Sequence, residues 1–464
     1  MLYGVILYLA VTLVIGLLSK KKKHDSKAFH GANLSVLICV VVGAGEWMGG
    51  TSTTGVSEYG YLWGLSGAWY TIANGIGIML CAICFAKLYR RLDTPTVSGI
   101  VGHYIGTRAR KVASIILIIV MMVVGISQMI AIGTLGQILF GIDMTVSILA
   151  LGFFVIFYTL LGGMVSIGYT NVLHMCVLYI GMLIAVIYCL NDVGGISAMT
   201  EKLPSSYFNM TNIGLPKVSS WILASVLGAC TAQAGIQPIL AAKDERVAVK
   251  SSVIIALIVA PFGILSACMG MIAKIKFPDL ANAKLALPTL MQHMSPVTSG
   301  IVMAALLAAI LSTAAPIFLA CGTLFTKDIY LSSHPDIEKN KELRISRLVT
   351  AISGTVCAVG AVLLHHNSVI LDIVYVAYSL RGSLFVILLF GIFSSKTKIS
   401  ENTAIISMIA TAIVGLFWVS FKLITGTYPI SAYFNETYAT VLTAFLTMTA
   451  GKCLSRRSVL TNAH

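Results

Sequence analysis

The sequence predicts an all-α integral membrane protein with about thirteen transmembrane helices, in a single domain that covers residues 1–464. Three observations predict this fold class. Hydrophobic residues make up 58% of the chain and charged residues only 10%, whereas a soluble domain carries about 25% charged residues. Apolar stretches of about 20 residues, enough to cross a bilayer, recur along the whole length. No hydrophilic segment between them is long enough to form a soluble domain.

The apolar stretches place the candidate spans. In chain order they cover residues 2–18, 35–57, 61–86, 112–140, 144–162, 166–190, 219–240, 251–273, 298–325, 346–365, 368–394, 401–424 and 430–451. The first span is preceded by no basic residue and followed by the run Lys20–Lys23. This order is typical of a start-transfer helix rather than of a cleaved signal peptide. The fifth and sixth spans are nearly continuous across Gly162 and Gly163.

Lysine and arginine are distributed unevenly over the predicted loops. If the N-terminus lies outside, most of these 31 residues fall in inner loops, beginning with Lys20–Lys23. The outer loops then hold only Lys202, Lys217, Lys274, Lys276, Lys284 and Lys422. By the positive-inside rule, this bias predicts an N-out, C-in orientation. It also accounts for the net charge of +14 without a nucleic-acid partner.

The second span contains a glycine-rich stretch, Val42–Gly55, with Glu46 in it. Glycines and a carboxylate are poorly suited to a lipid-facing helix. A glycine-rich interruption frees backbone carbonyls and persists only where it lines protein or a watery cavity. In transporters built from inverted repeats, such interruptions form substrate and ion sites. The alternative is a packing face of small residues, but Glu46 favours a site because a carboxylate has no place in a packing face.

The stretch Val302–Pro316 places hydroxyl and carbonyl oxygens together. Ser312 and Thr313 are adjacent, and Pro316 leaves the carbonyl of Ser312 without its helical partner. Oxygens of this kind suit a hard cation such as sodium. The alternative is that both hydroxyls bond to their own helix, as serine and threonine commonly do.

Together the two stretches resemble the sodium:solute symporter family. The run Ala304–Thr313, followed by Phe325–Tyr330, is similar to the signature of that family's eighth core helix. The run Tyr158–Asn171 resembles its Y-x-x-x-G-G-x-x-x-x-x-x-T-D stretch. The resemblance covers essentially the whole chain. It implies a multi-pass protein of the cell membrane that couples sodium to the uptake of a small polar organic solute by alternating access.

The resemblance also implies the LeuT-type fold. In this fold a leading helix, here 2–18, precedes two inverted five-helix repeats, here 35–240 and 251–394. Two trailing helices follow in 401–451. The family's conserved sodium site would use the carbonyls of Gly45, Met48 and Ala309 and the hydroxyls of Ser312 and Thr313. A second sodium site in the family depends on an aspartate that aligns with Asn171. Because asparagine carries no negative charge, one sodium ion is expected.

The family's substrate usually lies beside the sodium, over the interrupted first core helix. The matching positions here are Glu46, Trp47, Thr51, Ser52, Ser127, Gln128, Gly228, Ala229, Ala232 and Gln233. The side chains that bind galactose in sugar-transporting relatives are missing at Thr51, Ser52, Gly228 and Ala229.

The predicted pocket has only part of the aromatic cage of choline-transporting relatives. Those relatives also have a tryptophan at the place of Trp47, whose face suits an ammonium group. Their other cage aromatics are replaced here by Ile126 and Ala232. Together with Glu46, Trp47 therefore predicts a small nitrogen-containing solute that bears an amine.

Two charged residues, Asp372 and Arg381, lie in the span that the family uses as a gate. Arg381 is expected either to hold a substrate carboxylate or to close the gate, the alternative being an arginine that extends to the cytosol.

A proton-coupled carrier that uses Glu46 is the main alternative function. A channel would need repeated filter-like carbonyl rings, and an intramembrane enzyme would need a metal motif or a nucleophile–base pair. The sequence shows none of these. We expect a monomer in the lipid bilayer.

Overall fold

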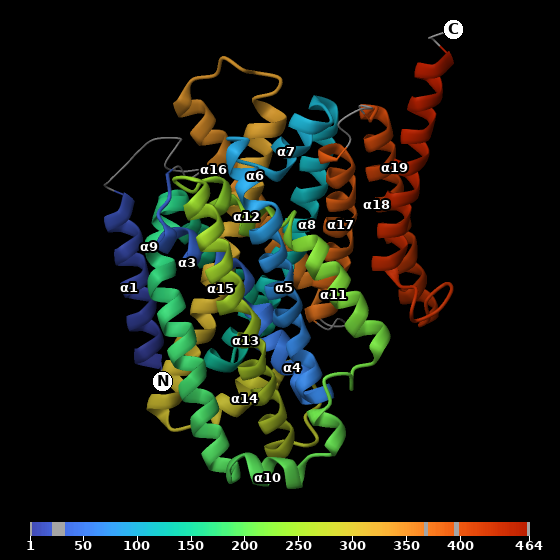
Figure 1. Ribbon diagram of the computed structural model, residues 1–464. Coiled ribbons are helices and arrows are strands. Elements are labelled where there is room, and N and C mark those ends of the chain that lie inside the picture. Colours follow the sequence, from blue (N-terminus) through green and yellow to red (C-terminus); the bar gives the residue numbers. More distant parts are fainter. Residues whose placement is uncertain (1, 21–32, 366–369, 394–398, 462–464) are drawn as a thin grey trace.

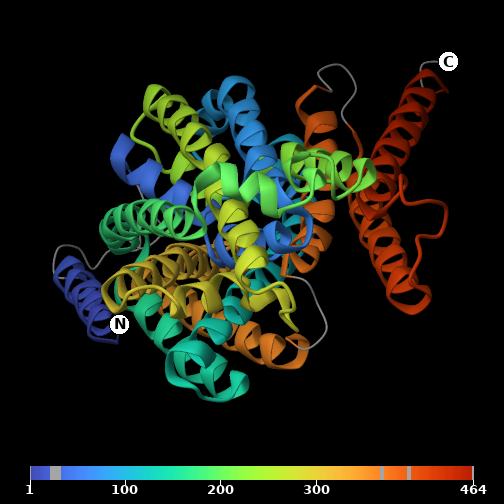
Figure 2. The same ribbon diagram turned by 90° about the horizontal axis from the view of Figure 1, so that it is seen from below.

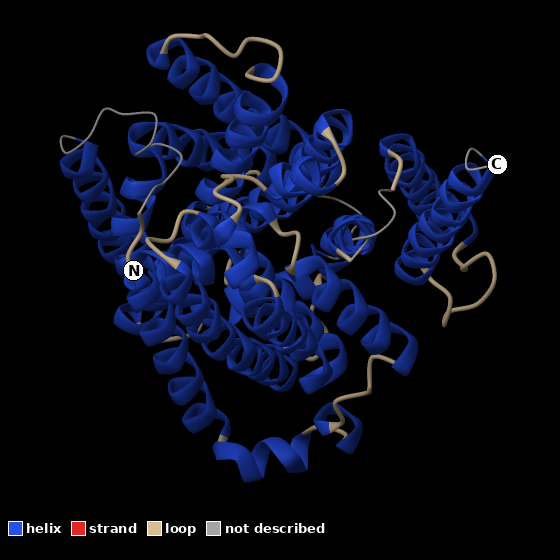
Figure 3. Cartoon of the chain, turned by 45° about the horizontal axis from the view of Figure 1, so that its top comes forward, coloured by secondary structure: helices blue, strands red, loops and turns tan. Residues whose placement is uncertain are grey.

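The computed structural model in Figure 1 describes residues 2–20, 33–365, 370–393 and 399–461. Over these residues the regular structure is helical, with one isolated parallel bridge between Leu34 and Ala242. Figure 3 shows the helices and their connecting loops. Eight described helices are long and apolar enough to cross a membrane, and several shorter apolar helices accompany them. The all-α membrane fold class is confirmed, while the count of thirteen spans and their orientation stay predictions.

The first half of the chain forms the helices labelled up to α12. They are α1 (Leu2–Lys20), α3 (Val36–Trp47), η1 (Thr51–Gly55), α4 (Val56–Trp63), η2 (Gly64–Ala68), α5 (Trp69–Cys84), α6 (Ala86–Arg91), α7 (Val97–Tyr104), α8 (Thr107–Phe140), α9 (Met144–Val193), α10 (Gly195–Lys202), η3 (Ser205–Phe208), α11 (Leu215–Ala229) and α12 (Gln233–Leu240).

The second half forms the remaining helices. They are α13 (Glu245–Lys276), η4 (Ala283–Leu285), α14 (Ala286–Gln292), α15 (Pro296–Leu324), η5 (Phe325–Tyr330), α16 (Lys339–Leu364), α17 (Ile370–Ile392), α18 (Glu401–Thr425) and α19 (Glu436–Thr461).

Two glycines in the left-handed region explain where helices end or bend. Gly64 has φ of 69° and ends α4 at Trp63, so the second span runs past the predicted limit of residue 57. Gly163, with φ of 63°, lies inside α9, and helix continues on both sides of it. The predicted spans 144–162 and 166–190 are therefore two helices that meet at this glycine within α9. Residues with a side chain rarely adopt such backbone angles.

The helix α15 lies in the core of the bundle. Every residue from Val302 to Leu324 is buried, as expected of a helix that is apolar on all sides. It packs against α8, α9 and α16, and α1 packs against both α9 and α15. The pair α18 and α19 pack together and against α17 at the edge of the bundle, as Figures 1 and 2 show in red. The core helices are therefore placed to carry a site, with the trailing pair outside them.

A buried carboxylate, Asp328 in η5, joins three elements at one end of the bundle. It accepts hydrogen bonds from the hydroxyls of Thr96 and Ser114 at 2.9 Å, and from Ser98. The guanidinium of Arg110 donates to it from Nε at 2.8 Å and from Nη2 at 2.5 Å. Asp328 therefore ties η5 to α8 and to the segment that begins α7.

Replacement of Asp328 by asparagine is expected to destabilise the protein by about 3 kcal/mol, because it breaks a buried ion pair and leaves Arg110 without its counter-charge. The melting temperature of purified protein measures this. The matched control is Asp93→Asn, whose carboxylate pairs with Arg90 at 3.0 Å but is 90% exposed. That exposed pair contributes little. Equal melting temperatures of the two variants would contradict the assignment.

Candidate functional site

The predicted interruption of the second span is confirmed. Helix α3 ends at Trp47, Met48 has φ of −114° and ψ of 49°, and helix resumes beyond Gly49 as η1. A Cβ atom on Gly49 would lie 2.7 Å from the Cβ of Thr313, so only glycine permits this approach. The freed N–H of Gly50 donates to Gln128 Oε1 at 2.8 Å. The interruption is thus fixed against α8.

Four of the five residues predicted to hold sodium come together. The hydroxyl of Thr313 donates to the carbonyl of Gly45 at 2.5 Å, and that of Ser312 lies 3.4 Å from the same carbonyl. The hydroxyl of Ser312 also donates to the carbonyl of Ala309 at 2.9 Å. The fifth residue, Met48, is buried directly after α3, but no described hydrogen bond joins it to the other four.

This set of oxygens fits an alkali cation. Gly45 and Ala309 offer carbonyl oxygens, and Ser312 and Thr313 offer hydroxyl oxygens, all from buried residues on α3 and α15. Such neutral, hard ligands suit sodium better than a transition metal. Consistent with this, no cluster of histidine, cysteine or carboxylate side chains that could hold another metal occurs in the part of the chain that the structure describes.

Asn171 on α9 lies directly beside these oxygens. Its Nδ2 donates to the carbonyls of Val41 at 3.3 Å and Ser312 at 3.4 Å. The second of these is the carbonyl that Pro316 frees from the helix. A Cβ atom on Gly45 would lie 2.7 Å from Nδ2, so the amide is packed against the interruption. Asn171 thus supplies hydrogen-bond donors at a place where an aspartate would supply charged oxygens.

Three of the residues predicted to contact solute form one buried hydrogen-bonded group. The amide of Gln128 donates to the Thr51 hydroxyl at 2.8 Å, and that hydroxyl lies 3.3 Å from the hydroxyl of Ser127. Ser52 instead donates to the carbonyl of Gly49 at 2.8 Å. This hydrogen-bonded group therefore joins η1 to α8 at the residues that follow the interruption.

A second interruption separates α11 from α12. Regular helix ends at Ala229 and resumes at Gln233. Beside it, a Cβ atom on Gly228 would lie 3.4 Å from the Cβ of Arg381 in α17. The apolar pattern predicts one uninterrupted span over 219–240. The second interruption was missed, although Gly228 and the short side chains after it were its signal.

Glu46, Trp47 and Arg381 meet between the two interruptions. The guanidinium carbon of Arg381 lies 5.5 Å from the ring centroid of Trp47 and 3.9 Å from that of Tyr378. A Cβ atom on Gly235 would lie 2.8 Å from Trp47 Nε1 and 3.2 Å from Glu46 Oε2. Residues from α3, α12 and α17 are therefore in contact here. Arg381 is fully buried, so it does not extend to solvent.

Of the remaining predicted site residues, Gln233 makes its hydrogen bonds elsewhere and Ala232 lies in the second interruption. Gln233 accepts a hydrogen bond from the Val97 amide at 2.8 Å and donates to the Pro95 carbonyl at 3.3 Å, so it holds the start of α7. Ala232 is buried just before α12. The side chain of Asp372 lies outside the described residues.

Sequence reasoning missed Tyr70, Asn74 and Tyr378. The hydroxyls of Tyr70 and Tyr378 lie 3.1 Å apart. Asn74, one turn after Tyr70 on α5, is fully buried, and neither polar atom of its amide has a hydrogen-bond partner among the described residues. An asparagine in the middle of an apolar span was the available signal, because a polar group at membrane depth is a functional candidate.

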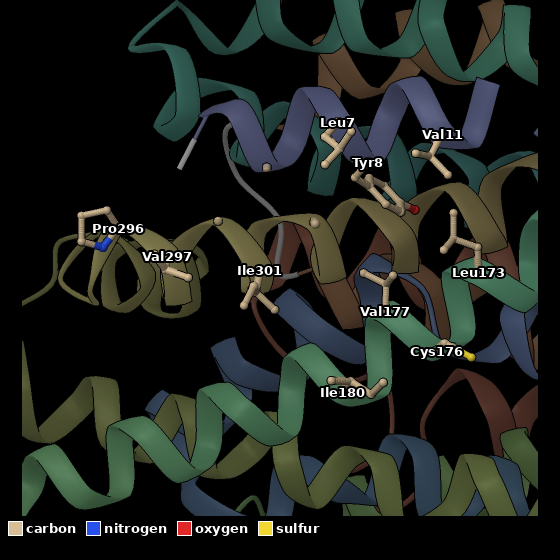
Figure 4. Close-up of a pocket in the computed structure, with 13 residues that line it drawn as sticks. Leu7, Tyr8, Val11, Leu173, Cys176, Val177, Ile180, Pro296, Val297 and Ile301 are labelled. Atoms are coloured by element: carbon tan, nitrogen blue, oxygen red, sulfur yellow. The ribbon is translucent and has the colours of Figure 1, made fainter. Parts of the chain in front are cut away.

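Two cavities are described, one beside the predicted solute residues and one away from them. A cavity of about 10 Å³ lies beside Trp47, Ile78 and Ala229, so the side chains there are packed closely. An apolar cavity of about 620 Å³ lies between α1, α9 and α15, and Figure 4 shows its lining. None of its lining residues belongs to the predicted site. Its polar edge is Tyr8, whose hydroxyl lies 2.6 Å from His174 Nδ1.

Known proteins match this chain over most of its length. The model of the sodium:solute symporter family matches residues 30–411. The sodium/glucose cotransporter of Vibrio parahaemolyticus is 26% identical over 462 residues, covering 89% of this chain and 83% of that protein. The sodium/proline symporter 2 of Staphylococcus saprophyticus is 24% identical, covering 89% and 85%. The human high affinity choline transporter 1 is 24% identical, covering 73% and 63%.

Solved structures of transporters share the fold. A sodium-coupled sialic acid symporter in a substrate-bound, outward-open state superposes with a TM-score of 0.81 at 18% identity, covering 97% of both chains. MhsT in complex with L-phenylalanine superposes with a TM-score of 0.58 at 14% identity, covering 91% of this chain and 99% of that one. These likenesses confirm the LeuT-type fold, and the family match over most of the chain confirms the resemblance read from its motifs. This multi-pass membrane protein therefore belongs to the sodium:solute symporter family.

Proposed function

We propose that this chain is a sodium-coupled symporter that carries a small, polar, nitrogen-containing solute by alternating access. The observation that carries the proposal is the convergence of the Ser312 and Thr313 hydroxyls on the Gly45 carbonyl. The proposed cation ligand Gly45 directly precedes Glu46 and Trp47, both of which lie beside Gly235 of α12. A bound sodium ion would compensate the freed carbonyls. It would thereby fix α3 against α15 and set the position of the solute residues that follow Gly45.

The solute proposal rests on Glu46 and Trp47. Glu46 is 5% exposed, and its Oε2 has no hydrogen-bond partner among the described residues. A carboxylate buried in this way must be protonated, paired or opposed by a bound positive group. The face of Trp47 suits the same positive group. An amine or ammonium group on the solute would meet both requirements.

A proton-coupled carrier is the second candidate, and the same burial of Glu46 favours it. If Glu46 carried the coupling proton, its side chain would change charge during transport, and uptake would follow a pH gradient without sodium. Glu46 adjoins Gly45, whose carbonyl belongs to the proposed sodium site, so sodium coupling explains more of the surrounding residues. The similar proteins and structures found are transporters, which favours transport over catalysis.

The proposed orientation in the cell membrane is N-out and C-in, with the chain acting as a monomer. Support comes from the basic residues, which gather with acidic partners at one end of the bundle. Arg91 pairs with Glu245 at 2.5 Å, and Lys327 with Glu342 at 2.6 Å. In Figure 1 this end, marked by α6 and α7, lies opposite the start of α1. It would face the cytosol by the positive-inside rule.

A single sodium ion predicts a sodium response with a Hill coefficient of about one, the limit for a single site. The Asn171→Asp variant is expected to raise that coefficient, because a carboxylate beside the Ser312 carbonyl would create a second cation site. Sodium titration of uptake measures both values. Asn191→Asp, an exposed change at the end of the same helix, is the matched control and should leave the coefficient unchanged. A clearly sigmoidal curve for the unaltered protein would contradict one-sodium coupling.

A melting-temperature screen of the purified protein tests the function before the solute is known. Amines, amino acids, carboxylates and sugars are added separately, each in sodium and in potassium at equal ionic strength. A ligand that binds only the folded state raises the melting temperature by mass action. The proposal expects stabilisation by a nitrogen-containing solute in sodium but not in potassium. Stabilisation of equal size in both salts would contradict sodium coupling.

A further inference from the structure

We infer that the solute is a small zwitterion, whose carboxylate binds the guanidinium of Arg381 and whose amino group faces Glu46. The inference rests on the proposed function, since it assigns the solute of that same site. It goes further by naming a negative group on the solute and the residue that recognises it.

Arg381 is a buried charge that interacts with the side chain of Tyr378 but has no carboxylate partner among the described residues. Its side chain is fully buried, and Nε, Nη1 and Nη2 all lack hydrogen-bond partners in the described ranges. Arginine keeps its proton in proteins, so this burial leaves a full positive charge without an acceptor. Contacts with the rings of Tyr378 and Trp47 offset part of that cost.

A carboxylate is the group that fits those donors. The planar guanidinium presents parallel N–H groups that match the two oxygens of a carboxylate. A sugar hydroxyl or an amine would leave the positive charge uncompensated, which is expensive in a buried site. The edge of Arg381 therefore selects for an anionic group on the solute.

Glu46 lies close to Arg381 but does not pair with it. The charge of Arg381 acts electrostatically on Glu46. However, Oε2 of Glu46 and all three guanidinium nitrogens lack hydrogen-bond partners among the described residues. Two opposite charges that are near each other yet unjoined match a ligand that also carries two opposite charges. A zwitterion would satisfy both charges. A simple amine would leave Arg381 without a negative partner, and a simple acid would leave Glu46 without a positive one.

Asn74 on α5 is a third buried polar residue with atoms that lack hydrogen-bond partners, after Glu46 and Arg381. Both atoms of its amide are buried without partners in the part of the chain that the structure describes. It lies one turn from Tyr70, whose hydroxyl contacts Tyr378, and one turn from Ile78, which lines a small cavity together with Trp47. By this spacing Asn74 lies on the same face of α5 as Tyr70 and Ile78. The amide can serve either end of a zwitterion.

The test compares matched ligands on the purified full-length protein in sodium. The probes are a mixture of neutral L-amino acids, a mixture of the same amino acids as carboxamides, and a mixture of the corresponding acids without the amino group. The inference expects the amino acids to raise the melting temperature. Titration should show them binding about ten- to a hundredfold more tightly than the carboxamides, the effect of losing a charged hydrogen bond.

Arg381→Gln should remove that preference, so that amino acids and carboxamides bind within about twofold of each other. A purely structural arginine would lower stability without altering the preference. Should Arg381→Gln fail to fold, Arg381→Lys keeps the charge but not the planar pair of donors and should reduce the preference only partly. The matched control is Lys422→Gln on α18. This change also removes a cation next to a ring, since Lys422 Nζ lies 4.7 Å from the ring centroid of Tyr428.

Three outcomes would overturn the inference: no stabilisation by the amino acids, carboxamides that bind as tightly, or deaminated acids that bind as tightly. The melting temperature in sodium without solute, compared with that in potassium, shows whether only the zwitterion inference fails or the proposed function fails as well. If sodium alone stabilises the protein while the amino acids do not, the sodium site stands and the zwitterion is wrong. If neither sodium nor any mixture stabilises it, both are wrong.

Discussion

Replacement of both Ser312 and Thr313 by alanine is expected to abolish the response of the protein to sodium. Both hydroxyls point to the carbonyl of Gly45, and both are fully or almost fully buried, at 0% and 1% exposure. Loss of two oxygen ligands to a cation should lower its affinity by at least about a hundredfold, since each polar contact to a charge contributes about 1.5–3 kcal/mol. Sodium titration of the melting temperature, and of uptake, measures the loss.

The matched control removes two buried hydroxyls that bond only to their own helices. Thr159 donates to the carbonyl of Val155 at 2.7 Å, and Ser252 to that of Ala248 at 2.8 Å. The Thr159→Ala, Ser252→Ala double variant should keep its sodium response. Expression of both double variants should be similar. Unchanged sodium dependence in the Ser312, Thr313 variant would show that the cation binds elsewhere.

Replacement of Glu46 by glutamine is expected to weaken solute binding by about ten- to a hundredfold while changing sodium affinity much less. The substitution keeps the shape of the side chain but removes the charge that faces the solute's positive group. Gly45 supplies its carbonyl to the sodium site through the backbone, so the adjacent side chain can change without loss of that ligand. Separate titrations of solute and sodium, each followed by melting temperature, measure the two affinities.

The control for this variant is Glu58→Gln, which neutralises another buried carboxylate of the same interrupted span, two helical turns beyond the interruption. It should leave the ratio of solute to sodium affinity unchanged. If the Glu46→Gln variant keeps full solute affinity, Glu46 has a structural role. The proposal that the solute bears an amine then loses its main support. If the variant instead loses only the pH response of uptake, proton coupling through Glu46 is favoured.

The fold could be predicted because its signals are local and strong. Long apolar stretches separated by charged loops indicate membrane helices, and the glycine-rich stretch around Gly49 predicts an interruption that the structure contains. Helix limits were less accurate where a single backbone angle decides them. The positive φ of Gly64 ends α4 beyond the predicted limit of residue 57, and this angle is not written in the hydrophobic pattern.

The candidate site could be predicted only in part, because it joins residues far apart in the chain. Ser312 and Thr313 were recognisable from a contiguous motif, and four of the five residues predicted to hold sodium are adjacent in the structure. Asn74 and Tyr378 were missed because their relevance comes from packing between α5 and α17, which no local pattern encodes. Gln233 shows the reverse effect. Its place near the second interruption suggested solute contact, but its amide bonds to the segment that begins α7.

The most direct test of sodium-coupled symport is uptake by proteoliposomes that contain the purified protein. The solute is the compound that gives the largest sodium-dependent stabilisation in the melting-temperature screen. An inward sodium gradient at equal pH on both sides should drive its accumulation, and an inward proton gradient in potassium should not. Accumulation driven by the proton gradient without sodium, together with none driven by sodium at equal pH, would contradict the account.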